Sequence, residues 1–91
     1  MLFDWDPDKA TQNLKKHGVD FQEAATVFAD SFSITYPDPD HSAEEDRFII
    51  IGMSKQNRLL IVAHTDRREL TRIISARVVT RKERRLYEGN A

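Results

Sequence analysis

The second half of the chain is rich in arginine, the side chain best suited to binding phosphate. Residues 47–91 contain nine Arg and two Lys against four acidic residues, whereas residues 1–46 contain three Lys against eleven Asp and Glu. The formal charges of the two parts are +7 and −8, although the whole chain carries only −1. A guanidinium group matches the geometry of phosphate oxygens and stacks on bases. The charge pattern therefore indicates a surface for a polyanion, unless folding mixes the two sets of charges.

Arg77 is the main candidate for a phosphate-binding cation, because it ends a predicted strand just before the last predicted helix. Its alternative role is a salt bridge to a carboxylate such as Glu83. Arg72 lies five residues earlier, so the alternation of a strand would place the two arginines on opposite faces of a sheet, barring a bulge. We expect Arg77 on the binding face and Arg72 nearer to the helices.

The three histidines are candidates for proton transfer, because imidazole titrates near neutral pH. His64 ends a predicted strand and is the preferred acid or base, although it could instead be a hydrogen-bonded histidine at a sheet edge. His17 lies in the last turn of a predicted helix, where capping of the last carbonyls is the simpler role. His41 lies in an acidic loop that does not fit an EF-hand, since Ala43 occupies its sixth position. We expect neither a metal site nor a cofactor.

The last predicted helix carries further candidates for chemistry. Thr80-Arg81-Lys82-Glu83 is a capping box, which gives Glu83 a structural alternative to a catalytic role. Tyr87 follows Glu83 by four residues and so shares its helix face. Its ring could stack on a base, take part in proton transfer, or pack the helix against a sheet.

The spacing of apolar residues predicts the elements that hold these side chains. Asp6 and Gly18 are typical start and stop residues for the first helix, and Asp20 begins the second. Gly89 can close the last helix. In chain order we expect a strand at 2–5, helices at 7–17 and 20–29, strands at 32–36, 48–53, 58–64 and 71–77, and a helix from 80 to about 88.

This β-α-α-β-β-β-β-α order predicts a small α+β fold in a single domain spanning residues 1–91. Four successive strands with short connections should form an antiparallel sheet, and the N-terminal helix hairpin should cover its apolar face. The other face should be partly open, with the arginines of the last strands and helix nearby.

Composition excludes several classes of protein. The chain is 40% hydrophobic and 32% charged, which is typical of a folded domain. It has no Cys, and therefore neither disulfides nor a thiolate zinc site. Its longest apolar run, Leu59–Ala63, is too short to span a membrane, and Asp4, Asp6 and Asp8 replace the cations of a signal peptide. We expect a cytoplasmic protein without a membrane partner.

Motifs along nearly the whole chain resemble those of BrnT-type ribonuclease toxins, which are relatives of the RelE-like toxins. They are Trp5-Asp6-Pro7-x-Lys9, Asn13-x-x-Lys16-His17-Gly18-Val19-x-Phe21-x-Glu23-Ala24, Glu45-x-Arg47-Phe48-x-x-x-Gly52, His64-Thr65, Arg72-Ile73-Ile74-Ser75-Ala76-Arg77 and Arg81-x-Glu83-x-x-x-Tyr87-Glu88. The resemblance implies a RelE-like fold and metal-independent endoribonuclease activity that inhibits growth. It also implies a BrnA-like antitoxin with a ribbon-helix-helix domain, so that operator DNA is bound only through the toxin–antitoxin complex.

Metal-free RNA cleavage needs a base for the 2′-OH, a cation for the phosphorane and an acid for the 5′-oxygen. The expected catalytic residues are Arg77, His64, Glu83 and Tyr87. The expected RNA-binding residues are Arg67, Arg72, Arg81, Lys82 and Arg84. Two alternatives remain open: a non-catalytic module that binds nucleic acid or a partner through the basic C-terminal face, and a purely protein-binding role.

Overall fold

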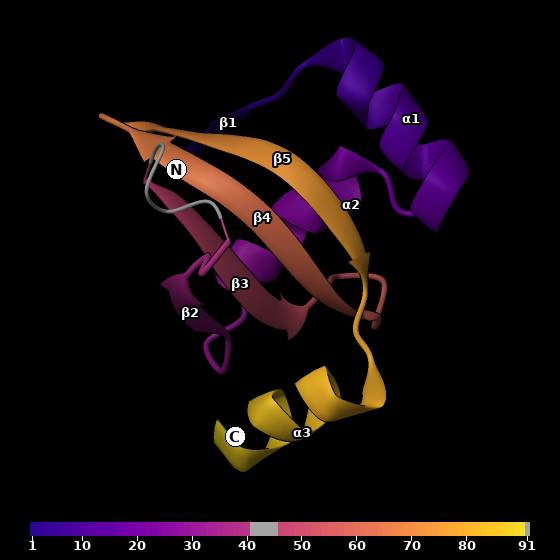
Figure 1. Ribbon diagram of the computed structural model, residues 1–91, viewed down its shortest axis with the longest axis vertical. Helices are drawn as coiled ribbons and strands as arrows, with labels where there is room; N and C mark the ends of the chain where they lie inside the picture. The colour runs from indigo at the N-terminus through magenta and orange to yellow at the C-terminus, as the bar shows by residue number, and fades with distance from the viewer. Residues whose placement is uncertain (41–45, 91) are drawn as a thin grey trace.

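The computed structural model describes residues 1–40 and 46–90 and has the predicted α+β order (Figure 1). The predicted fold class is confirmed, and most element boundaries agree within a few residues. The elements are β1 (Leu2–Asp4), α1 (Pro7–His17), α2 (Phe21–Thr26) with a 3-10 turn (Val27–Ala29), β2 (Ile34–Pro37), β3 (Arg47–Met53), β4 (Leu59–Arg67), β5 (Leu70–Val78) and α3 (Arg81–Asn90).

The five strands form one mixed sheet in the order β1-β5-β4-β3-β2. Strands β2 to β5 are the predicted antiparallel meander. The sheet is not antiparallel throughout, however, because β1 pairs in parallel with residues Leu70–Arg72 of β5. Without β1, the outer edge of β5 would expose unpaired N–H and C=O groups there.

One face of the sheet packs against the helix hairpin of α1 and α2; in Figure 1, α2 lies behind the sheet and α1 lies beyond the β5 edge. Phe21, Ala24 and Val27 of the hairpin region are fully buried. They contact the sheet residues Ile50, Leu60, Val62, Ile73 and Ala76. This cluster is the main hydrophobic core, as the apolar stripe of the second helix predicts.

Among the described residues, α3 covers one end of the opposite face. Tyr87 of α3 packs there against a second cluster that includes Ile51, Leu59 and Ile61. We call this side of the sheet, which carries Ile61 of β4 and Arg77 of β5, the open face. It is the face that the sequence predicts to be incompletely covered.

A β-bulge in β5 changes the arrangement of its arginines. Ala63 of β4 is paired with Ser75, but the next residue, His64, is paired with Ile73, so that Ile74 is left out of the register. Arg72 then pairs with Thr65 and Arg77 with Ile61. Since Thr65 and Ile61 lie on one face of β4, both arginines are on the open face. The prediction of opposite faces is therefore wrong.

Two other local predictions differ from the structure. The strands predicted at 58–64 and 71–77 are longer in the structure, and a tight turn joins them in place of a polar loop; Arg68 in this turn has a φ of 57°. Gly89 lies within α3 and does not close it. Among the described residues, no helix is both long enough and apolar enough to cross a membrane.

The buried side chain of Asn13 joins α1 to the edge of β5 beyond the end of β1. Its Nδ2 donates to the carbonyls of Val19 at 3.0 Å and Ala76 at 2.8 Å, and its Oδ1 accepts from the Ala76 N–H at 3.1 Å. The amide thus satisfies the backbone of Ala76 as a neighbouring strand would. It holds the C-terminal end of α1 beside the strand that carries Arg77.

Candidate active site

A cleft with a volume of about 190 Å³ opens on the open face. Its apolar lining includes Ile49, Ile61 and Ala63 of the central strands. The described residues of its polar lining are His17, Ser75 and Arg77 on the β5 side and Asp38 and Asp40, which follow β2. An arginine, a histidine and two carboxylates therefore surround a space large enough for a small polar group.

Arg77 is held in a fixed orientation at this cleft by Glu83 of α3. Its Nη1 and Nη2 donate to Glu83 Oε1 at 2.7 Å and Oε2 at 2.8 Å. The Arg77 side chain nevertheless remains 40% exposed. The salt bridge that was the alternative role of Arg77 is thus present, and the same arginine also lines the cleft.

Glu83 is also the last residue of the predicted capping box. Its Oε1 accepts from the Thr80 N–H at 2.8 Å, and its own N–H donates to Thr80 Oγ1 at 3.2 Å. The Arg77 hydrogen bond, with help from Thr80, lowers the pKa of Glu83 to about 2. The same pair raises the pKa of Arg77. Both groups are therefore charged at neutral pH, and Glu83 is a poor proton acceptor.

Tyr36 of β2 is a neighbour of this pair that the sequence did not single out. It is paired with Ile49 and half-buried on the open face. Burial and then the charge of Glu83 raise the pKa of Tyr36, whereas Arg77 lowers it. Strand alternation places Ile34 and Tyr36 on the same face of the sheet, but it does not show that this is the open face.

His17 is half-buried at the end of α1 and lines the cleft together with Ser75 and Arg77. The helix is closed by Gly18, whose φ is 69° and whose N–H donates to the Leu14 carbonyl at 2.9 Å. The capping role that the sequence suggests for His17 is therefore filled by Gly18. The motif Lys16-His17-Gly18-Val19 was the signal that could have identified this histidine.

His64 lies on the other face of the sheet, away from Arg77. It is 3% exposed, and its ring packs edge-on against Phe28 at 4.8 Å and stacks with Phe48 at 6.0 Å. Burial lowers the pKa of His64. The alternation of β4 explains this position, since Ile61 and Ala63 face the cleft and His64 pairs with Ile73.

Tyr87 attaches α3 to the rest of the domain. Its hydroxyl donates to Asp30 Oδ2 at 2.7 Å, and the residue is only 9% exposed. This hydrogen bond, together with burial, raises the pKa of Tyr87 to about 12. Of the roles that the sequence left open for Tyr87, the structure shows the packing of α3 against the sheet.

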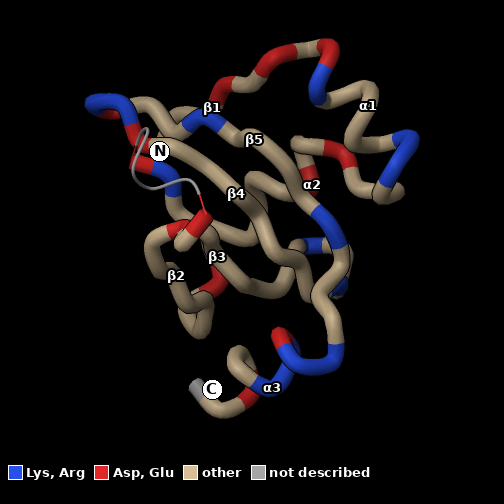
Figure 2. Tube along the Cα trace, viewed as in Figure 1, with Lys and Arg blue, Asp and Glu red and all other residues tan. Residues whose placement is uncertain are grey.

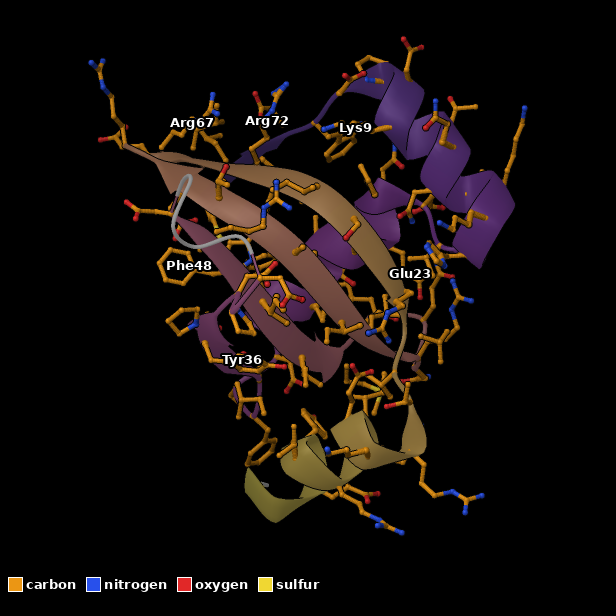
Figure 3. All side chains as sticks on the ribbon, in the orientation of Figure 1. Lys9, Glu23, Tyr36, Phe48, Arg67 and Arg72 are labelled. Atoms are coloured by element: carbon orange, nitrogen blue, oxygen red, sulfur yellow. The ribbon has the colours of Figure 1, made fainter. Side chains whose placement is uncertain are left out.

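The cations expected to bind RNA lie toward the two ends of β5. Arg67 is exposed beside the turn between β4 and β5, and Arg72 forms an ion pair with Asp4 at 3.1 Å (Figure 3). Arg81, Lys82 and Arg84 are exposed on α3, next to Arg77 in the chain. Figure 2 shows these basic positions at the start of α3 and near the β4–β5 turn.

Folding pairs acidic residues of the first half with arginines of the second half. Asp4 binds Arg72, and the buried Glu23 accepts from Arg58 Nε at 3.0 Å. The described part of the chain contains no group of three or more side chains arranged to hold a metal ion. His41, Glu44 and Glu45 of the acidic loop lie outside the described residues.

These features define a small α+β domain with an arginine-containing cleft on a half-covered sheet, an architecture suited to a polyanionic substrate. A family comparison identifies it further. The chain belongs to the family described as ribonuclease toxin, BrnT, of type II toxin–antitoxin systems, whose profile matches residues 5–83. The predicted family is thereby confirmed.

The fold is similar to that of a solved member of the same class of toxins. The crystal structure of the Brucella abortus ribonuclease toxin, BrnT, aligns with a TM-score of 0.69 and 22% sequence identity. The alignment covers 89% of this chain and 100% of that chain. Comparison with curated protein sequences gives no match.

Proposed function

We propose that this chain is an endoribonuclease toxin that cleaves RNA without a metal ion in the cleft beside Arg77. The observation that carries the proposal is the Arg77–Glu83 pair, which presents an oriented, permanently charged guanidinium to the cleft. Membership of a ribonuclease toxin family supports RNA as the substrate.

Arg77 is the proposed electrostatic catalyst of the reaction. Negative charge builds up on the phosphorus oxygens as the 2′-oxygen attacks, and a cation fixed in advance stabilises that charge without having to reorient. Glu83 uses both carboxylate oxygens to hold two guanidinium nitrogens of Arg77. We assign Glu83 a positioning role, because its low pKa makes it unsuited to accept a proton.

His17 and Asp40 are the proposed proton-transfer groups. They line the cleft from its β5 side and its β2 side, respectively. A carboxylate can take the proton of the 2′-OH while the 2′-oxygen bonds to phosphorus, and an imidazolium can protonate the 5′-oxygen as its bond to phosphorus breaks. The products are a 2′,3′-cyclic phosphate and a 5′-hydroxyl.

The test is RNA cleavage by the purified protein in excess EDTA. We expect cleavage to continue and to leave 2′,3′-cyclic phosphate ends, which end-specific labelling can identify. Loss of all cleavage on chelation, restored by a divalent cation, would contradict the metal-free mechanism. Salt-dependent RNA binding without any cleavage would favour a non-catalytic module instead.

We further propose that the antitoxin is a BrnA-like protein with a ribbon-helix-helix domain, and that operator DNA is bound only by the complex. The type II toxin–antitoxin family supports a protein antitoxin as the partner. Expression of this chain alone should arrest growth, and co-expression of a neighbouring ribbon-helix-helix gene should relieve the arrest. Growth arrest that no such neighbour relieves would contradict this partner.

A further inference from the structure

A second hollow lies along α1 and adjoins the cleft of the proposed active site. The two hollows share His17 and Ser75 as lining residues. The second is otherwise lined mainly by polar side chains of α1, including Lys9, Gln12 and Lys16. We call it the α1 groove. It extends the concave surface from Arg77, past His17, onto the part of α1 before His17, which the proposed chemistry does not use.

The spacing of the α1 residues explains why one groove collects both lysines. Lys9, Gln12 and Lys16 lie at positions i, i+3 and i+7 and therefore share one face of the helix. The buried Asn13 lies on the same face and ties it to Ala76 of β5. Figure 3 shows Lys9 on α1, on the β1 side of the domain. The groove is thus a fixed feature of the contact between α1 and β5.

The chemistry of the α1 groove suits a strand of phosphates. Lys9 and Lys16 are exposed, and neither makes an ion pair with another described residue. Two turns of helix separate them by about 10 Å along the axis, so they can contact different phosphates of one strand. Ile74 is the only large apolar side chain among the lining residues, which disfavours an apolar partner segment.

We propose that the α1 groove binds the backbone phosphates of single-stranded RNA next to the scissile phosphate. The strand would pass from Arg77 across His17 and Ser75 to Lys16 and then Lys9. This inference rests on the proposed function, because that function makes RNA the substrate of the adjoining cleft. It assigns the lysines of the acidic first half to the same binding surface as the arginines of the second half.

The test compares two double variants for binding to a single-stranded 2′-O-methyl RNA, which cannot be cleaved through a 2′-OH. Lys9→Gln/Lys16→Gln removes both groove cations. Lys15→Gln/Lys55→Gln removes two exposed lysines that line neither hollow and has the same net charge. Affinity is measured at several salt concentrations, and cleavage of the unmodified RNA is measured in parallel.

We expect the groove variant to bind roughly tenfold more weakly at low salt and to lose about 1.4 from the slope of log affinity against log salt, as for two phosphate contacts. The control should lose much less. Equal behaviour of the two variants would overturn the groove and leave the proposed function intact. If the wild type binds the 2′-O-methyl RNA but does not cleave the unmodified RNA, the proposed function is overturned. The salt dependence of binding by the two variants would then still test the groove. Absence of wild-type binding would overturn both.

Discussion

Arg77 differs from the other basic side chains of this protein because it is both oriented and exposed to a cleft. Glu83 fixes its guanidinium through two hydrogen bonds, and Thr80 fixes Glu83 in turn. Arg72 also has a carboxylate partner, Asp4, but it is not among the residues that line the cleft. An oriented cation is what stabilisation of a phosphorane requires.

Glu83→Gln tests this positioning role. The variant keeps a hydrogen-bonding side chain but loses the charge that orients Arg77, so we expect cleavage to fall about tenfold or more. Glu83→Asp should also cleave RNA more slowly than the wild type. Its side chain is shorter and cannot reach both Nη atoms of Arg77 and the Thr80 N–H at the same time. The control is Glu88→Gln, an exposed change on the same helix, which should leave cleavage unchanged.

The same variant has an effect on stability whose sign follows from the pKa. Glu83 titrates at about 2 in the folded protein, below the ordinary value of 4.5, so its ionised form stabilises the fold above pH 4.5. That contribution is lost as the pH falls from 4.5 towards 2. After allowance for screening at the half-exposed Arg77, we expect Glu83→Gln to cost about 1–2 kcal/mol at pH 7. Urea unfolding at pH 7 and pH 3 should show the difference shrinking at the lower pH.

His64 provides a separate test of the site assignment. Burial lowers the pKa of His64 in the folded protein. As the pH falls, His64 is therefore protonated in the unfolded chain before it is protonated in the folded one. The stability of the wild type then decreases as the pH drops below the pKa of His64 in the unfolded chain. His64→Leu should remove this part of the pH dependence between pH 7 and 5 and retain cleavage. His17→Gln should instead reduce cleavage, because His17 lines the cleft as a proposed proton-transfer group. Loss of cleavage in a folded His64→Leu variant would restore His64 as a catalytic candidate.

At the scale of elements, α3 is held by contacts at both of its ends. The capping box and Arg77 hold its first turn, and Tyr87 holds its later part through Asp30. Asp30 also accepts from the backbone N–H of Met53 at 2.7 Å, so it joins α3 to the end of β3. The position of α3 in turn sets the position of Glu83 beside Arg77.

Tyr87→Phe distinguishes this anchoring role from a catalytic one. It removes one hydrogen bond to a charged group, and we expect a loss of about 1–2 kcal/mol in the free energy of unfolding. Cleavage below the unfolding range should stay within about threefold of wild type, because the ring still packs in its cluster. A folded Tyr87→Phe protein without cleavage would instead indicate that the hydroxyl takes part in the reaction.

The elements themselves could be predicted from the sequence, but their exact relations could not. Capping residues such as Asp6, Gly18 and Thr80 act locally, and the structure confirms the roles expected of them at these helix ends. The bulge at Ile74 and the pairing of β1 with β5 depend on long-range packing, which has no local signal. Because of the bulge, a correct strand assignment still gave the wrong face for Arg72.

The burial of a candidate residue could not be predicted from the sequence. His64 and His17 have the same side chain, and the sequence favoured the one in a strand over the one in a helix end. In the fold, His64 lies between Phe28 and Phe48, whereas His17 lines the cleft because Asn13 holds α1 beside β5. None of these contacts can be inferred from spacing along the chain.

At the scale of the whole molecule, the charge asymmetry of the sequence does not become two separate surfaces. The chain returns on itself so that β1 joins β5, and acidic and basic side chains from opposite halves meet in ion pairs. Figure 2 shows acidic and basic segments interspersed around the sheet. The cleft itself combines Arg77 and His17 with Asp38 and Asp40. Such a mixed lining fits acid–base chemistry on a phosphate better than simple polyanion binding.

The most direct test of this account is single-turnover RNA cleavage by Arg77→Ala and Arg77→Lys in EDTA, with Arg85→Ala as a control for the loss of one exposed arginine. We expect both Arg77 variants to lose at least about a hundredfold in cleavage rate, because Lys keeps the charge but not the paired geometry. Arg85→Ala should stay close to wild type. Cleavage by folded Arg77→Ala at the wild-type rate would contradict the assignment of the active site to this cleft.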